Sequence, residues 1–78
     1  MLKIKLSLSG SLRHIYEDKQ SEIVIEVQNP TTVRKLLCSI GINPIVVARV
    51  FVNGKCESKD YLIATDEEIV LLGPLAGG

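Results

Sequence analysis

Hydrophobic and polar residues alternate strictly at the start of the chain. The apolar members of this run are Leu2, Ile4, Leu6 and Leu8. Successive side chains of a β-strand point to opposite faces, so the alternation predicts a strand over residues 2–9 with one buried face. A second alternating run predicts a strand over residues 22–28. The polar stretch 10–21 between them predicts a connection, which makes the two strands a loose antiparallel hairpin.

The spacing of apolar residues becomes helical after Asn29-Pro30. Thr31 or Thr32 fits the N-cap position, where a hydroxyl accepts from a free amide of the first turn. Apolar residues then follow at i, i+3, i+4 and i+7, which predicts one buried stripe. These residues are Val33, Leu36, Leu37 and Ile40. Gly41 fits the left-handed position after the helix, and Pro44 prevents the helix from resuming.

Strand-forming residues dominate the remainder of the chain. Residues 45–52 are mostly β-branched and predict a third strand. Asn53-Gly54 predicts a type I′ hairpin turn into a short strand at residues 55–56. We expect Tyr61-Leu62-Ile63 to pack a short turn onto the core and residues 68–72 to form the last strand.

The predicted order of elements is β-β-α-β-β-β. Several strands with one amphipathic helix predict a mixed sheet with that helix across one face. We expect the first strand to be central, antiparallel to the second and parallel to the last. An α+β fold of the β-grasp, or ubiquitin-like, type satisfies this order, with a sheet of four to five strands. We expect one domain over residues 1–78, with a flexible tail at about 73–78.

Composition narrows the classes of function. The chain has 78 residues, 46% of them hydrophobic, and its nine basic and nine acidic residues cancel. It therefore lacks the basic excess of nucleic-acid-binding proteins. Its apolar runs fall short of the roughly 20 residues of a transmembrane helix, and the alternating start does not resemble a signal peptide. We expect a cytoplasmic protein with neither nucleic acid nor membrane as a partner.

The potential metal ligands and nucleophiles are few. Cys38 and Cys56 are far apart, without CxxC spacing, and the single histidine, His14, lies in the polar connection. A metal site or redox dithiol is therefore not expected. We interpret both cysteines as free structural thiols. A thioester or acyl disulfide with a partner is the alternative. No nucleophile–base pair is evident, so the sequence predicts no catalytic residue.

The last two residues, Gly77 and Gly78, are the most specific chemical feature of the sequence. Glycine has no side chain, so it can pass through a channel too narrow for other residues. A terminal carboxylate is also an acyl group that an ATP-dependent enzyme can activate without cutting the chain. A random Gly-Gly end should occur in roughly half a percent of chains. Chance and an added tag remain as alternatives.

Alternation in the third and last predicted strands also defines an outward face. Its members are Val47, Arg49, Phe51, Val70 and Leu72. This face would be unusually apolar for solvent and would lie beside the tail, which indicates a docking surface. Phe51 and Leu72 are the expected hot spots, although single exposed apolar residues are common. Leu75 is expected either to anchor in a pocket of the partner or to fold back on the sheet.

Three motifs resemble the prokaryotic sulfur carriers ThiS and MoaD. They are Thr32-Val33 with Leu36-Leu37, Val52-Asn53-Gly54, and Pro74-Leu75-Ala76-Gly77-Gly78. Residues 50–55 with the Gly-Gly end are also similar to the second half of ubiquitin, where Phe51 falls at the central aliphatic residue of the partner-binding face. The chain differs in having Asp66-Glu67 where many relatives have Gly-Asp. The pathway stays open among ThiS, MoaD, tRNA-thiolation carriers and small archaeal modifiers.

The resemblance implies a carrier and not an enzyme. An E1-like adenylyltransferase of the ThiF or MoeB type would use ATP and Mg to adenylate Gly78, while Gly77 threads its channel. A cysteine desulfurase or rhodanese would supply sulfur, and the thiocarboxylate would serve a sulfur-accepting synthase in thiamine, molybdopterin or tRNA thiolation. The chain itself would bind no cofactor. The alternatives are a ubiquitin-like modifier joined to lysines through Gly78 and a passive interaction module.

Overall fold

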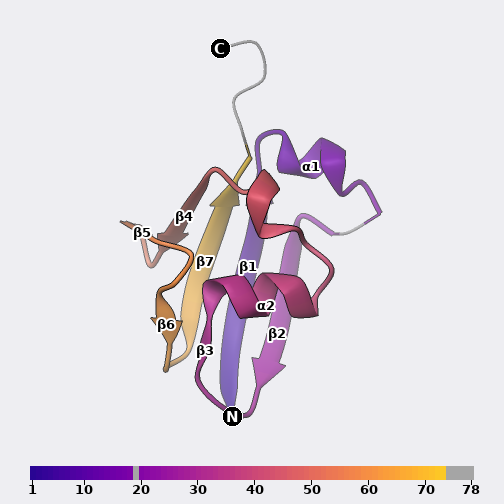
Figure 1. Ribbon diagram of the computed structural model, residues 1–78. Helices are drawn as coiled ribbons and strands as arrows, with labels where there is room; N and C mark the ends of the chain where they lie inside the picture. Colours follow the sequence, from indigo (N-terminus) through magenta and orange to yellow (C-terminus); the bar gives the residue numbers. More distant parts are fainter. Residues whose placement is uncertain (19, 74–78) are drawn as a thin grey trace.

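The computed structural model describes residues 1–18 and 20–73. Its main sheet has five strands in the order β2-β1-β7-β4-β5 (Figure 1). The strands are β1 (Leu2–Ser9), β2 (Glu22–Val27), β4 (Arg49–Val52), β5 (Lys55–Glu57) and β7 (Glu67–Leu72). β1 pairs antiparallel with β2 and parallel with β7, and β4 pairs antiparallel with β7. The mixed sheet with a central first strand is as predicted.

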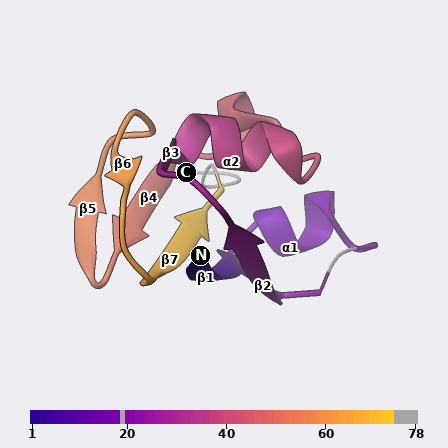
Figure 2. The same cartoon turned by 90° about the horizontal axis from the view of Figure 1, so that it is seen from below.

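The main helix, α2 (Val33–Ser39), follows the predicted pattern. The hydroxyl of Thr32 accepts a hydrogen bond from the Lys35 amide at 3.2 Å, so Thr32 is the N-cap. Gly41 has a φ of +81°, the left-handed conformation expected just after the helix. The apolar stripe of α2 packs on one face of the sheet (Figure 2). The fold therefore has the two layers that the sequence predicts.

A two-stranded sheet beside α2 was not predicted. It pairs β3 (Thr31–Thr32) with β6 (Leu62–Ile63). The predicted turn at residues 61–63 is therefore partly a strand, although Ile63 does reach the core with 0% exposure. The first amides of α2 donate to this segment: Val33 N to Tyr61 O at 3.1 Å and Arg34 N to Lys59 O at 2.8 Å. The loop thus satisfies helix amides that would otherwise lack partners.

The predicted strand over residues 45–52 is wrong in its first half. A 3₁₀ helix, η1 (Pro44–Val46), takes its place, and β4 begins only at Arg49. The reason lies just upstream, where Asn43 Oδ1 accepts from the Ile45 amide at 3.0 Å and caps the turn. Proline is well suited to the first position of such a turn because its φ is fixed and it needs no donor there.

The polar connection also contains a short helix that was not predicted, α1 (Leu12–Ile15). Leu12 is completely buried and belongs to the same core as the α2 stripe, and Figure 2 shows both helices on the same side of the sheet. The Tyr16 hydroxyl accepts a hydrogen bond from the Asn43 amide at 2.8 Å. This bond ties the end of α1 to the start of η1.

The core between sheet and helices is entirely apolar among the described residues. It comprises Ile4, Leu6, Leu8, Leu12, Val33, Leu36, Leu37, Ile42, Val47, Val50, Val52, Ile63, Ile69 and Leu71. The β4–β5 turn has the predicted geometry, with φ of +51° at Asn53 and +86° at Gly54, as a type I′ turn requires. This turn fixes which side chains of β4 and β5 share the outer face.

Candidate interaction face and exit of the C-terminal segment

The outward side chains of β4 and β7 meet on the face of the sheet opposite α2. Phe51 lies opposite Val70 in the ladder, and Arg49 lies opposite Leu72. Phe51 and Leu72 are half-buried, whereas Val70 is 37% exposed and Arg49 is exposed. We call the cluster of Phe51, Val70 and Leu72 the Phe51 patch. Phe51 and Val70 are cross-strand neighbours within contact distance, and Leu72 follows Val70 by two residues on the same face of β7.

Val47 does not belong to this face. The sequence placed it outward by extending the strand alternation back to residue 45, but the side chain is 0% exposed. Val47 follows η1, and its amide donates to Pro44 O at 3.2 Å. The interruption of the strand changes which way residue 47 points. Its predicted docking role is therefore wrong, and Val47 is a core residue.

Cys56 is a member of the face that the sequence analysis did not place there. It lies on β5 directly opposite Phe51, and its thiol is exposed. Its position could have been inferred from the Asn53-Gly54 turn, because a two-residue hairpin forces residue 52 opposite residue 55 and residue 51 opposite residue 56. Among the described residues both Cys56 and Cys38 are free thiols. Cys56 extends the Phe51 patch to the sheet edge.

The other half of the outer face is charged. A shallow groove of about 370 Å³ is lined there by Lys3, Lys5, Val24, Asn53, Asp66, Glu67 and Glu68. Lys5 Nζ lies 3.5 Å from Glu22 Oε1, with both side chains about half exposed. Such an exposed pair contributes little to stability. The Phe51 patch is therefore bounded on one side by charged residues and lies toward the end of the sheet where β7 terminates.

β7 ends at the same end of the sheet as α1 and η1 (Figure 1). The Leu72 carbonyl accepts from the Ala48 amide at 2.8 Å, and Leu72 pairs with Ser9 of β1 on its other side. Gly73, which the sequence assigned to the tail, is buried. The predicted site residues Leu75, Gly77 and Gly78 lie outside the described residues. The structure therefore defines the start of the C-terminal segment and the face beside it.

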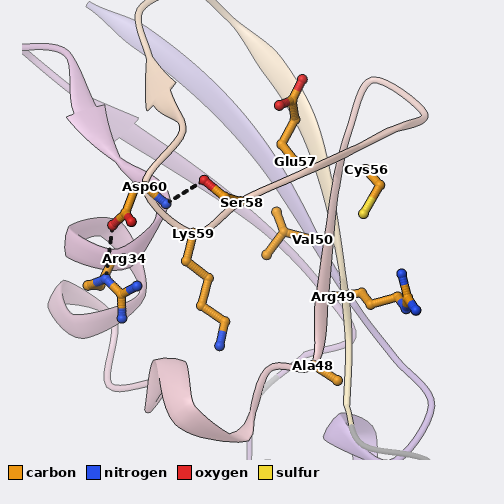
Figure 3. Close-up of a pocket in the computed structure, with 9 residues that line it drawn as sticks. All are labelled: Arg34, Ala48, Arg49, Val50, Cys56, Glu57, Ser58, Lys59 and Asp60. Atoms are coloured by element: carbon orange, nitrogen blue, oxygen red, sulfur yellow. Dashed lines mark hydrogen bonds and ion pairs between the residues drawn. The ribbon is translucent and has the colours of Figure 1, made fainter.

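A second groove, of about 240 Å³, lies between α2, β4 and the segment after β5 (Figure 3). Its lining includes Arg34 of α2 and Lys59 and Asp60 of the loop. Arg34 Nε donates to Asp60 Oδ1 at 3.2 Å, and the Asp60 amide donates to Ser58 Oγ at 3.2 Å. Figure 3 shows the Lys59 side chain extending into the space between Arg34 and Ala48. The groove thus combines both signs of charge at its rim.

This second groove has no catalytic arrangement. Its lining includes residue Cys56 but no histidine, and the single histidine of the chain lies in α1. Across the described part of the chain, no cluster of three or more histidine, cysteine or acidic residues could hold a metal ion. Histidine is a common activating base for a nucleophilic thiol, and this lining does not supply one.

Tyr61 and Glu67 form a polar contact under the loop that carries β6. The Tyr61 hydroxyl donates to Glu67 Oε1 at 2.7 Å. This hydrogen bond, together with burial and the charges of Glu67 and Glu57, raises the pKa of Tyr61 above its ordinary value of 10.0. Glu67 Oε2 is buried and has no hydrogen-bond partner among the described residues. The tyrosine therefore supplies the hydrogen bond that this carboxylate receives there.

No model of a protein family matches the sequence, and no curated protein matches it either. Solved structures do. SAMP1 from Haloferax volcanii is 19% identical and aligns with a TM-score of 0.72 over 97% of this chain and 99% of its own. A Pyrococcus furiosus protein described as molybdopterin converting factor, subunit 1, is 18% identical, with a TM-score of 0.70 over 96% and 100%. The fold is the ubiquitin-like β-grasp.

A third similar structure is that of the Haloferax volcanii HVO 2177 protein. It is 18% identical, with a TM-score of 0.72 over 99% of this chain and 87% of its own. At such identities the likeness establishes the fold. In addition, none of the helices in the described ranges is long and apolar enough to cross a membrane.

Proposed function

We propose that this chain is a sulfur carrier whose Gly78 carboxylate is activated by an E1-like adenylyltransferase and converted to a thiocarboxylate. One observation supports this more than any other. The strand β7 lies inside the sheet between β1 and β4 and brings the chain to Gly73, five residues before Gly78 and beside the Phe51 patch. A reactive end that begins next to an apolar face suits delivery to other proteins.

The chemistry needs an activated acyl group, because a carboxylate has no good leaving group. An oxygen of the Gly78 carboxylate attacks the α-phosphorus of ATP, and pyrophosphate leaves. Hydrosulfide then attacks the carbonyl carbon of the acyl adenylate, AMP leaves with the oxygen, and a thiocarboxylate remains. A persulfide donor gives an acyl disulfide instead, whose S–S bond a second thiol must reduce. The carrier presents the reacting atom, and its partners supply the catalysis.

The outer face of the sheet has the side chains expected of a carrier that binds its catalytic partners. The Phe51 patch offers apolar area for a partner, and Arg49 adjoins it at the end nearest Gly73. Interfaces are commonly built around a buried aromatic anchor and an arginine. We therefore assign docking to Phe51, Val70, Leu72 and Arg49, and add Cys56 as a rim residue. Leu75 is proposed as a further anchor in the activating partner.

A ubiquitin-like modifier is the second candidate, joined through Gly78 to lysine amines of other proteins. The similar structure of SAMP1, a small archaeal modifier protein, favours it, whereas the similar molybdopterin converting factor subunit favours sulfur transfer. Activation of the terminal carboxylate is common to both. They differ in the nucleophile that displaces AMP, which is sulfur in one case and an amine in the other.

Intact-mass measurement separates these candidates. The purified chain is incubated with an E1-like enzyme, ATP, Mg and a sulfur source, and its mass is compared with that of a chain lacking Gly78. A sulfur carrier gains the mass difference between sulfur and oxygen, and the shortened chain does not. A Gly-Gly remnant on lysines of cellular proteins would instead establish the modifier. An unchanged mass with an enzyme that is active on another carrier would contradict sulfur transfer.

A further inference from the structure

Gly73 makes an unusually close backbone contact. The residue is buried at the point where the chain leaves β7. A Cβ atom added at Gly73 would overlap Ser11 Oγ and would lie 3.0 Å from Leu12 N and 3.1 Å from Leu12 Cγ. One of these atoms belongs to the backbone, which cannot move aside as the end of a side chain can. The contact of Gly73 with Ser11 and Leu12, here called the exit contact, therefore favours glycine, because a larger residue would force Ser11 Oγ to move and the backbone to shift by a few tenths of an ångström.

The partner side of the exit contact is firmly held. The Ser11 carbonyl accepts from the amides of His14 and Ile15, both at 3.1 Å. Leu12 is completely buried in the core, and its carbonyl accepts from the Tyr16 amide at 2.9 Å. These bonds hold the shape of the turn, and the burial of Leu12 holds it against the core. A side chain at residue 73 would therefore displace the chain leaving β7 more readily than it would displace α1.

The residue before Gly73 is fixed as well. Leu72 lies between two neighbours, with its carbonyl bonded to the Ala48 amide at 2.8 Å and its backbone paired with Ser9 of β1. Gly73 is thus the last point at which the body determines the path of the chain in the described structure. Five residues follow it to Gly78, and covalent geometry limits their reach to about 18 Å.

We propose that Gly73 is a positioning residue, which the exit contact holds so that Gly78 reaches the active site of a partner docked on the Phe51 patch. This inference rests on the proposed function. Docking on the Phe51 patch positions residues 1–72 on the partner, and the exit contact positions Gly73, where the C-terminal segment begins. The sequence sets the number of residues between Gly73 and the reacting carbon of Gly78. An origin that moves by about 1 Å can lower the rate of a positioned reaction by about a hundredfold.

The first part of the test asks whether a side chain at residue 73 perturbs the structure only around the exit contact. Gly73→Ala is compared with Ser11→Ala, which removes the overlapping Oγ, and with the double variant. Gly54→Ala is the matched control, because its Cβ would meet open space while its φ of +86° still strains alanine. Gly73→Ala should lower Tm and speed hydrogen exchange at the Ala48 amide, and adding Ser11→Ala should restore part of both. Gly54→Ala should lower Tm without the local exchange effect.

The second part measures activation by ATP–pyrophosphate exchange, with an E1-like adenylyltransferase from the same organism. At a temperature where the variants are folded, Gly73→Ala should lower kcat about tenfold to a hundredfold and change KM by less than about twofold. The double variant should recover part of kcat, and Gly54→Ala should match wild type. Insertion of one glycine after Gly73 keeps the exit contact and tests reach alone; it should also lower kcat.

The outcomes separate the two proposals. If the wild-type chain supports no exchange with an enzyme that is active on another carrier, the proposed function is contradicted. If wild type is activated and folded Gly73→Ala and the insertion variant are activated equally well, the role of Gly73 is overturned while the proposed function stands. A loss in KM instead of kcat would also overturn it, because that result would place residue 73 in docking.

Discussion

Two valines distinguish the core from the interaction face, and the same substitution at each gives opposite results. Val47 and Val70 are both placed outward by strand alternation, but Val47 is 0% exposed and Val70 is 37% exposed. We therefore compare Val47→Asp with Val70→Asp. The two variants have the same composition and net charge. Any difference between them reports the surroundings of the two positions.

The magnitude follows from burial. Val47→Asp loses the burial of a valine side chain, about 1.5–3 kcal/mol. It also places a carboxylate among apolar residues, which costs several kcal/mol more. The sum of about 5 kcal/mol or more is comparable to the whole stability of a domain of this size, about 4–12 kcal/mol. Val70→Asp mainly loses strand propensity and should cost about 1 kcal/mol.

Urea denaturation followed by far-ultraviolet circular dichroism measures both variants. Val47→Asp should be largely unfolded without denaturant, and Val70→Asp should unfold cooperatively with a slightly lower midpoint. The folded Val70→Asp chain should then bind an activating partner more weakly than wild type, since a charge replaces part of the Phe51 patch. A cooperative Val47→Asp chain with a near wild-type midpoint would refute the assignment of residue 47 to the core.

Three further predictions concern single contacts. Thr32→Ala should lower the free energy of unfolding by about 1 kcal/mol, because the Lys35 amide loses its N-cap partner; an unchanged urea midpoint would argue against the cap. The stability of the wild-type chain should fall as pH rises above 10.0, because the folded state holds the Tyr61 proton more tightly than the unfolded state does. Thermal melts at several pH values should show a shallower fall in Tm with pH for Tyr61→Phe. An identical dependence of Tm on pH in both chains would contradict the hydrogen bond to Glu67. Phe51→Ala should weaken binding to an activating partner by about tenfold or more in calorimetry, and unchanged affinity would remove Phe51 from the docking face.

The elements that could be predicted are those whose pattern is local and long. β1 alternates over eight residues, and α2 has a cap, a stripe and a terminal glycine within a short stretch. The Asn53-Gly54 turn is specified by backbone conformation alone. Such signals do not depend on distant contacts, and the predicted pairing of the first strand with the second and the last is confirmed.

The missed elements depend on partners far away in the sequence. α1 is recognised by the burial of Leu12 against the core, and a four-residue helix is too short to show a periodic pattern. β3 and β6 form a strand pair only because each has the other. The 3₁₀ helix η1 was overlooked because β-branched residues after Pro44 favour a strand, whereas the Asn43 cap decided the local structure.

The candidate site was predictable to a similar extent. Alternation correctly placed Phe51, Val70 and Leu72 on one face because β4 and β7 are regular there. It failed at Val47, where regular strand structure has not yet begun. The close approach at Gly73 could not be predicted, since it depends on an α1 turn that is more than sixty residues earlier in the chain.

The most direct test of the central claim is ATP–pyrophosphate exchange with the wild-type chain and with a chain that lacks only Gly78. The account predicts that an E1-like adenylyltransferase exchanges pyrophosphate into ATP when the wild-type chain is present. The shortened chain should bind through the intact Phe51 patch but support little exchange. Equal exchange with both chains, or none with either while another carrier is activated, would contradict the claim that Gly78 is the reactive end.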